Sequence, residues 1–188
     1  MSRIMIGNDI IDLKLAKKES NYRRAGFLDK QFSSNEQAQI KSTSNTFHLI
    51  WRLWSMKEAA YKVYTQQNEN RFFAPKKFDC KISSGLNGFV YFKDKLFYTS
   101  TNINDKYIFT LASFTKKTKA FSQVVNPQLL DKIIKNKLED ETKFSSMGIV
   151  KKKSENGVPL YYHKNILLTK SCSISHHGNY GVFSLILN

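Results

Sequence analysis

The sequence predicts an α+β fold in which two helix-then-strand stretches follow one another. Residues 46–64 have helical periodicity, and short strand-like runs follow them after Pro75. Residues 127–141 form a second helical stretch that also precedes strand-like runs. No linker rich in proline, glycine or serine separates the stretches, so we expect closely packed parts. These are the first half, residues 1–118, and the second half, residues 119–188.

The first half is expected to open with a strand over residues 3–11. Alternation places Gly7 and Asp9 on one face with the apolar Met5 and Ile11. Ser33 and Glu36 have capping-box spacing, which predicts a helix start and makes Glu36 a cap rather than a catalyst. The long helix follows. The expected strands cover residues 77–82, 89–92, 96–99 and 107–114.

The second half is expected to open with a helix, because Asn126 can cap it and Pro127 suits the first helical position. Asn156-Gly157 predicts a turn before a short strand over residues 160–163. Gly178-Asn179 predicts the turn of a hairpin. Its strands are expected over residues 171–176 and 180–187.

The composition indicates a soluble, cytoplasmic protein that attracts polyanions. Lysine and arginine number 30 against 15 acidic residues, for a formal charge of +15. Such a charge suits nucleic acid, phosphorylated cofactors, acidic lipids or an acidic protein, and does not choose among them. No apolar run is long enough to span a membrane. Cys80 and Cys172 are isolated, which fits a reducing compartment.

A carboxylate in the long helix carries the first functional signal. Glu58 shares a helical face with aromatic residues, which predicts that it is buried. The stripe consists of Phe47, Trp51, Trp54 and Tyr61. A buried carboxylate needs a positive partner, either a metal ion or a lysine. Lys62, one turn further on, is a candidate, and a pairing with Lys62 alone is the structural alternative.

Asp9 is the second carboxylate on an apolar face, and together with Glu58 it suits an oxygen-preferring Mg²⁺ site. Mg²⁺ binds one or two protein carboxylates and completes its octahedron with water and phosphate oxygens. The pair therefore points to phosphate chemistry.

The segments around both carboxylates have recognisable spacing. Residues 6–12 (IGNDIID) contain G-x-D, residues 32–36 read FSSNE, and residues 54–62 (WSMKEAAYK) fit W/F-S/A-x-K-E-A-x-x-K. Near the C-terminus, residues 173–182 contain Ser-His before an apolar strand, and residues 157–159 form a Gly-x-Pro turn. In order and spacing these segments resemble the signatures of the 4'-phosphopantetheinyl transferase superfamily, including holo-acyl-carrier-protein synthases.

The resemblance implies a reaction and its metal. The enzyme would move the phosphopantetheine arm of coenzyme A onto a serine of an acidic apo acyl or peptidyl carrier protein and release 3',5'-ADP. Mg²⁺, or alternatively Mn²⁺, would be held by Asp9 and Glu58. Glu58, or a water that it orients, would take the serine proton. The +15 charge would then steer the acidic carrier.

The resemblance also implies residues that contact coenzyme A. Lys62 and Lys57 would lie on its phosphates, and Ser175 with His176 would make further phosphate contacts. Lys151 stands for a lysine cluster that could receive the 3'-phosphate. Neither a membrane nor nucleic acid is then expected as a partner.

The resemblance bears on assembly as well. Short family members are trimers, whereas long members are pseudo-dimers that carry the Ser-His strand before G-x-D. This chain is longer than the short members, and its Ser-His strand follows the K-E-A helix. We therefore expect a monomer whose two similar halves form an intramolecular pseudo-dimer. A trimer is the alternative.

The sequence departs from the family pattern at Ile11, where long members carry a second acid, and at Val158, where the G-K-P lysine is absent. Asp12 either supports the metal ligands without binding the metal itself or caps the end of the strand. His177 should point away from His176, which argues against a zinc site. From another class, a non-catalytic nucleic-acid-binding module would explain the charge but neither carboxylate.

Overall fold

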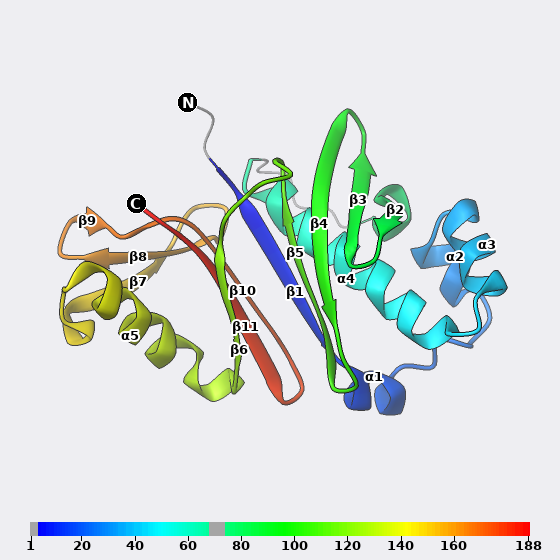
Figure 1. Cartoon of the computed structure of the whole chain (residues 1–188), viewed down its shortest axis with the longest axis horizontal. Coiled ribbons are helices and arrows are strands. Elements are labelled where there is room, and N and C mark those ends of the chain that lie inside the picture. Colours follow the sequence, from blue (N-terminus) through cyan, green and yellow to red (C-terminus); the bar gives the residue numbers. More distant parts are fainter. Residues whose placement is uncertain (1–3, 68–73) are drawn as a thin grey trace.

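The computed structural model describes residues 4–67 and 74–188, and its elements form two α+β halves (Figure 1). The elements of the first half are β1 (Ile6–Asp12), α1 (Leu13–Glu19), α2 (Phe27–Gln31), α3 (Ser34–Ser42), α4 (Thr46–Thr65), η1 (Pro75–Lys77), β2 (Asp79–Ser84), β3 (Asn87–Phe92), β4 (Lys95–Ile103) and β5 (Tyr107–Ser113). Those of the second half are β6 (Phe121–Val125), η2 (Pro127–Leu129), α5 (Leu130–Thr142), η3 (Ser146–Gly148), β7 (Ile149–Lys153), β8 (Pro159–His163), β9 (Ile166–Leu167), β10 (Thr169–His177) and β11 (Tyr180–Leu187). This mixed α+β architecture with several sheets agrees with the expected fold class.

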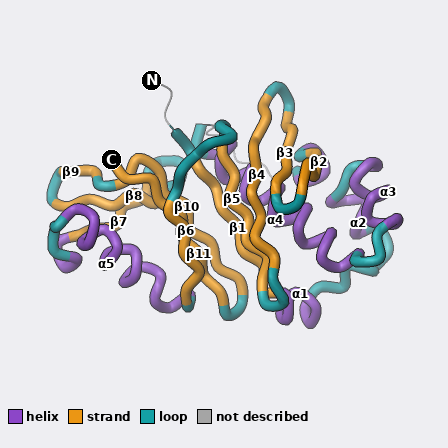
Figure 2. The backbone as a smooth tube through the Cα atoms, viewed as in Figure 1, coloured by secondary structure: helices purple, strands orange, loops and turns teal. Residues whose placement is uncertain are grey.

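The first half is a five-stranded antiparallel sheet with the order β1-β5-β4-β3-β2, and α4 packs against it (Figure 2). Strand β1 lies very close to α4, because a Cβ atom on Gly7 would be 2.1 Å from the Ala59 carbonyl oxygen. A side chain at residue 7 would push the strand away from the helix. The glycine of the G-x-D segment therefore sets the spacing between the two elements.

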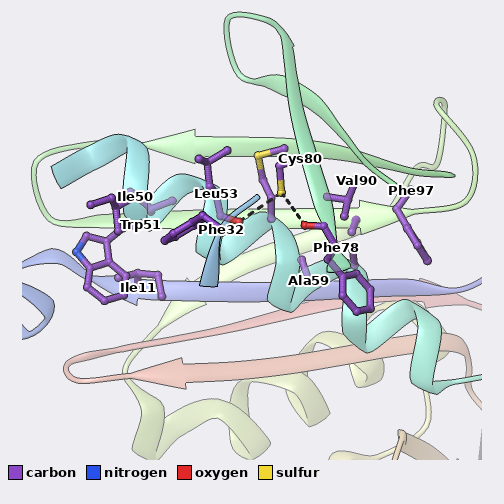
Figure 3. Packing of buried hydrophobic residues seen from close by; sticks show 14 of the residues in the cluster. Ile11, Phe32, Ile50, Trp51, Leu53, Ala59, Phe78, Cys80, Val90 and Phe97 are labelled. Carbon is purple, nitrogen blue, oxygen red and sulfur yellow. Dashed lines mark hydrogen bonds between the residues drawn. The ribbon is translucent and has the colours of Figure 1, made fainter. Parts of the chain in front are cut away.

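The core of the first half lies between α4 and the sheet. Figure 3 shows Leu53 and Ala59 of the helix together with Phe78, Val90 and Phe97 from the sheet side. Burial of such side chains is the main favourable term in folding. The thiol of Cys80 is buried and unpaired with another cysteine, and it donates to the Leu53 carbonyl oxygen at 3.6 Å.

The second half has a separate core under α5. Strands β10, β11 and β6 form one sheet in that order, and β7, β8 and β9 form another. Ile134 and Leu138 of α5 are fully buried against residues that include Phe183 of β11. The first strand β6 pairs with the last strand β11, as β1 pairs with β5, and in each half a helix follows later in the chain.

Side chains of β10 join the two halves along the edge of β1. The N–H groups of Ile6 and Asn8 donate to the hydroxyl oxygens of Ser171 and Ser173 at 3.1 and 2.9 Å. The Asp12 N–H donates to His177 Nδ1 at 2.9 Å. These side chains replace the carbonyl groups that a neighbouring strand would offer to an edge strand. Ser175 and Ser184 make further contacts to the Asn8 side chain.

Most of the expected elements are present. The long helix covers Thr46–Thr65, the capping box of Ser33 and Glu36 forms, and the side chain of Asn126 caps the turn that leads into α5. The opening strand begins at Ile6, and residue 3 lies outside the described residues. In the described residues, no helix is long and apolar enough to cross a membrane.

The structure also contains elements that were not predicted: α1, α2, β6, β7 and β9, together with the short 3-10 turns η1 and η3. Strand β7 contains three consecutive lysines, the cluster represented by Lys151 in the sequence analysis. It is an edge strand, and lysines on such strands discourage pairing with other chains. Short elements of this kind carry too little apolar periodicity to be recognised from sequence.

Candidate active site

Strand β1 and helix α4 bring Asp9 and Glu58 together. Alternation places Asp9 on the same face of β1 as Gly7, which is the face that meets Ala59, Lys62 and Val63 of α4. Asp9 Oδ2 is buried and has no hydrogen-bond partner. A buried carboxylate oxygen without a hydrogen-bond partner fits a position at which a cation can bind.

The electrostatics of the two carboxyl groups agree with that interpretation. Burial raises the pKa of Asp9 to about 6, although the charge of Lys62 acts in the opposite direction. Burial, followed by the charge of Asp9, raises the pKa of Glu58 to about 7, and Lys62 again opposes the shift. A second carboxylate nearby makes it harder to ionise both. The charge of Lys62 therefore offsets only part of the effect of burial on the two carboxyl groups.

Two carboxylates fit the ligand set of a magnesium ion. Within residues 4–67 and 74–188, no group of three or more His, Cys, Asp or Glu side chains converges on one point. Zinc sites typically use three or four such ligands, whereas Mg²⁺ accepts one or two carboxylates with water and phosphate oxygens. Asp9 and Glu58 are thus suited to Mg²⁺ or Mn²⁺.

Glu58 is less buried than the sequence predicted. The buried side of α4 carries Leu53, Met56 and Ala60, whereas Glu58 is half-buried at the border of that side. The aromatic stripe was interpreted as the core face, but Trp54 and Tyr61 are themselves only half-buried. Glu58 therefore combines a desolvated position with access to the surface.

Lys62 stands at the junction of the two halves. Its Nζ donates to the Asn8 carbonyl oxygen at 2.8 Å and also to the hydroxyl of Ser175 in the second half. In the described part of the chain, the ion pairs join Lys57 to Glu36, Lys135 to Asp131 and Lys137 to Glu141, so Glu58 has none with Lys62. The structural alternative, in which Lys62 alone satisfies Glu58, is not supported.

Lys57 does not belong to this site, which corrects its predicted role on the phosphates. Its side chain is fully buried and forms an ion pair with the equally buried Glu36 at 2.8 Å. The ammonium also donates to the carbonyl oxygens of Pro75, at 3.0 Å, and Phe78. All three of its hydrogens are used. Lys57 therefore joins α4 to the segment before β2.

Glu36 has a larger structural role than a cap. Besides Lys57, its carboxylate accepts the N–H groups of Ser33 and Cys80, both at 2.8 Å. The buried ion pair thus links α3, α4 and β2. Lys57, the member of the pair in α4, directly precedes Glu58 in the chain. Sequence reasoning found the capping box but had no signal for the long-range partner.

Strand β10 presents Ser175 to the site and turns His176 away. Ser175 is buried against β1, whereas His176 is exposed on the other face of the strand. His177 is again on the β1 side, where it accepts the Asp12 N–H. The expected opposition of the two histidines is confirmed. A role for His176 in binding coenzyme A stays a prediction.

Asp12 caps a helix. Its Oδ1 accepts the Leu15 N–H at 3.1 Å at the start of α1, and its Oδ2 accepts the Asn179 N–H at 3.0 Å. Burial raises the pKa of Asp12, but the backbone donors of Asn179 and Leu15 outweigh it, so the pKa is lower than usual. Of the two roles considered for Asp12, the structure supports the cap.

A cavity of about 250 Å³ opens beside Lys62 between the two halves. The C-terminal part of α4 forms one wall, and β10 with the turn before β8 forms the other. Lys151 is exposed on β7, and its charge acts on the buried thiol of Cys172 in the cavity wall. The lining residues are Tyr61, Lys62, Thr65, Gln66, Asn156, Gly157, Val158, Pro159, Cys172, Ser173 and Ile174.

Asn8 and Ser173, which hold this junction together, were not predicted as site residues. Asn8 was the unspecified middle residue of G-x-D. Alternating polar residues in β10, at positions 171, 173, 175 and 177, were the available signal that one face of the strand meets a polar partner.

Comparison with known proteins identifies the family. The model of the 4'-phosphopantetheinyl transferase superfamily matches residues 5–115, which is more than half of the chain. The chain therefore belongs to this superfamily and is a transferase of that type. No curated protein matches it.

Replacing Lys57 should damage stability rather than substrate binding. Lys57→Met leaves the Glu36 carboxylate buried without its partner, which we expect to cost about 3–5 kcal/mol of unfolding free energy. Urea unfolding measures this loss. The double variant Lys57→Met, Glu36→Gln should recover part of it, because no unpaired charge is then buried. Unchanged stability with a strongly raised KM for coenzyme A would instead indicate that Lys57 contacts the phosphates of coenzyme A.

Metal binding should weaken as the pH falls. Because the pKa values of Asp9 and Glu58 are raised to about 6 and about 7, protons compete with the cation below neutral pH. The same shifts favour the protonated groups in the folded state, so stability without metal should fall as pH rises through this range. We expect Mg²⁺ to raise the melting temperature at about pH 8 and to have little effect at about pH 5.

The control for this measurement is Glu58→Gln, which should abolish the Mg²⁺ effect at both pH values. An equal increase in melting temperature at both pH values, or one that persists in Glu58→Gln, would contradict the assignment of the metal to Asp9 and Glu58.

Proposed function

We propose that this transferase moves the 4'-phosphopantetheine group of coenzyme A to a serine hydroxyl of an apo acyl or peptidyl carrier protein. The serine oxygen forms a new bond to the phosphorus of the pantetheine arm, and the bond from that phosphorus to the bridging pyrophosphate oxygen breaks. The serine loses its proton, and 3',5'-ADP leaves with the bridging oxygen. The observation that carries this proposal is the convergence of Asp9, Glu58 and Lys62 next to a cavity between the halves.

Asp9 and Glu58 would hold Mg²⁺ or Mn²⁺. A divalent cation there supplies positive charge for the pyrophosphate oxygens and the leaving group. The unpartnered Oδ2 of Asp9 supports this role. Lys62 would contact the phosphates from the side of the second half, because its ammonium is already held at that border by Asn8 and Ser175.

Glu58, or a water that it orients, would accept the proton of the carrier serine. A general base works best when its pKa lies near the operating pH. Burial and the neighbouring Asp9 raise the pKa of Glu58 to about 7, and its half-buried position leaves it within reach of a substrate. Asp9 is shielded more deeply at Oδ2 and would serve the metal alone.

The cavity between the halves would receive coenzyme A. Lys62 lines it together with neutral polar and apolar residues. Ser175 would act mainly through Lys62, since its hydroxyl is buried and contacts that ammonium. His176 and Lys151 are both exposed and would remain available for the 3'-phosphate.

The carrier protein would approach over α1. This helix follows β1 directly, so it lies beyond the end of the strand that carries Asp9. Exposed basic side chains gather there, and Glu19 is the acidic residue among them. They are Lys14, Lys17, Lys18, Arg23 and Arg24. A basic surface beside the site would speed the encounter with an acidic carrier.

The two halves would form a pseudo-dimer that functions as a monomer. Each half pairs its first strand with its last, and the second half supplies Ser173 and Ser175 to the site of the first. We expect light scattering after size exclusion to give a mass near 21.8 kDa. A mass three times larger at micromolar concentration would contradict this arrangement.

The transfer itself is tested with coenzyme A, Mg²⁺ and a panel of apo carrier proteins. Intact-mass spectrometry should detect the phosphopantetheine adduct on the carrier serine. Glu58→Gln should reduce kcat by about 100-fold or more, since it loses both a metal ligand and the base. Lys132→Ala, at an exposed position of α5, is the control and should retain activity. If no carrier gains mass, the proposed function is wrong.

A further inference from the structure

Asn8 is fully buried at the middle of β1, and every hydrogen-bonding position of its amide is occupied. Its Nδ2 group donates to the Ser173 carbonyl oxygen at 2.9 Å and to the Ser184 hydroxyl at 3.0 Å. Its Oδ1 accepts the Ser173 hydroxyl at 2.9 Å and lies 2.9 Å from the Ser175 hydroxyl, whose single hydrogen is shared between this oxygen and the Asn8 carbonyl oxygen. An asparagine side chain has two donor hydrogens and two acceptor lone pairs. The second half satisfies all four.

The same residue contacts Lys62 through two routes. The Asn8 carbonyl oxygen accepts Lys62 Nζ at 2.8 Å, and the Ser175 hydroxyl between them accepts the same ammonium. That hydroxyl also lies 2.7 Å from the Asn8 carbonyl oxygen. Among the described residues, these bonds use two of the three ammonium hydrogens. The third can donate to a ligand.

These contacts fix the direction in which Lys62 points. A lysine side chain has four rotatable carbon–carbon bonds and loses considerable rotamer freedom when it is held in place. Asn8 and Ser175 hold the ammonium at the border of the cavity. Without the amide, the Ser175 hydroxyl would keep its contact with the Asn8 carbonyl oxygen but lose the one with Oδ1, and β10 and β11 would lose the bonds that Ser173 and Ser184 make to this side chain.

We infer that Asn8 is a positioning residue: it locks the second half onto β1 and thereby orients Lys62 toward the phosphates of the substrate. This inference rests on the proposed function, which it extends to a residue outside the metal and phosphate contacts. Asn8 also lies between Gly7 and Asp9 in the chain. The lock therefore holds the second half at the part of β1 that carries the metal ligand.

The test measures the Kd of coenzyme A by calorimetry in the presence of Mg²⁺. Asn8→Ala should raise the Kd by about 10-fold or more, the usual effect of losing hydrogen bonds that serve a charged group. Ser184→Ala removes one bond from the opposite end of the same amide, away from Lys62, and is the matched control. It should change the Kd by less than about 3-fold, although both variants lower the melting temperature.

A double-mutant cycle separates positioning from general destabilisation. If Asn8 acts through Lys62, then Asn8→Ala should change the Kd by less than about 2-fold when Lys62→Ala is already present. An equal loss in both backgrounds would overturn the inference, as would an unchanged Kd in Asn8→Ala alone. Ser175→Ala replaces Asn8→Ala in the cycle if that variant does not fold, because it removes only the intervening hydroxyl.

Failure of the proposed function gives a different result. A wild-type chain that binds no coenzyme A would contradict the function itself. The cycle would then be run with inorganic pyrophosphate and Mg²⁺, which need only the charges around Lys62. Non-additive losses between Asn8→Ala and Lys62→Ala would still support the lock, and additive losses would overturn it.

Discussion

The close approach of β1 to α4 is the constraint on which the rest of the site depends. At Gly7 the strand touches the helix backbone, because even a Cβ atom would lie 2.1 Å from the Ala59 carbonyl oxygen. The next residue on that face is Asp9, so the contact sets how far its carboxylate lies from Glu58. The opposite face of β1 carries Asn8 and is tied to β10. One strand is thus fixed from both sides.

Two pairs of charged residues near α4 show how burial separates structure from function. Glu36 and Lys57 have opposite charges, and hydrogen bonds from three segments satisfy them. Such a pair favours one arrangement of the helix and has no capacity for a ligand. Asp9 and Glu58 have like charges, raised pKa values and one unpartnered oxygen. The first pair holds α4 in place, and the second keeps an unfavourable state that a cation would relieve.

The sequence predicted the local features and missed those that depend on distant contacts. Period and capping residues located α4, the capping box at Ser33 and the hairpin that ends the chain, because each signal lies within a few residues. The wrong prediction for Lys57 and the overestimated burial of Glu58 have one cause. A helical wheel shows which residues share a face but not which face meets the sheet. Strands of that sheet lie up to 55 residues after Glu58 in the chain.

The two halves contribute different groups to the proposed site, and this difference follows from the same geometry. The family match ends at residue 115, so it contains Asp9, Glu58 and Lys62 but none of β10. The two proposed metal ligands, Asp9 and Glu58, both lie in the matched segment. The second half supplies hydroxyl and amide-binding groups along an edge strand, a task that serine residues at alternate positions of any strand can perform.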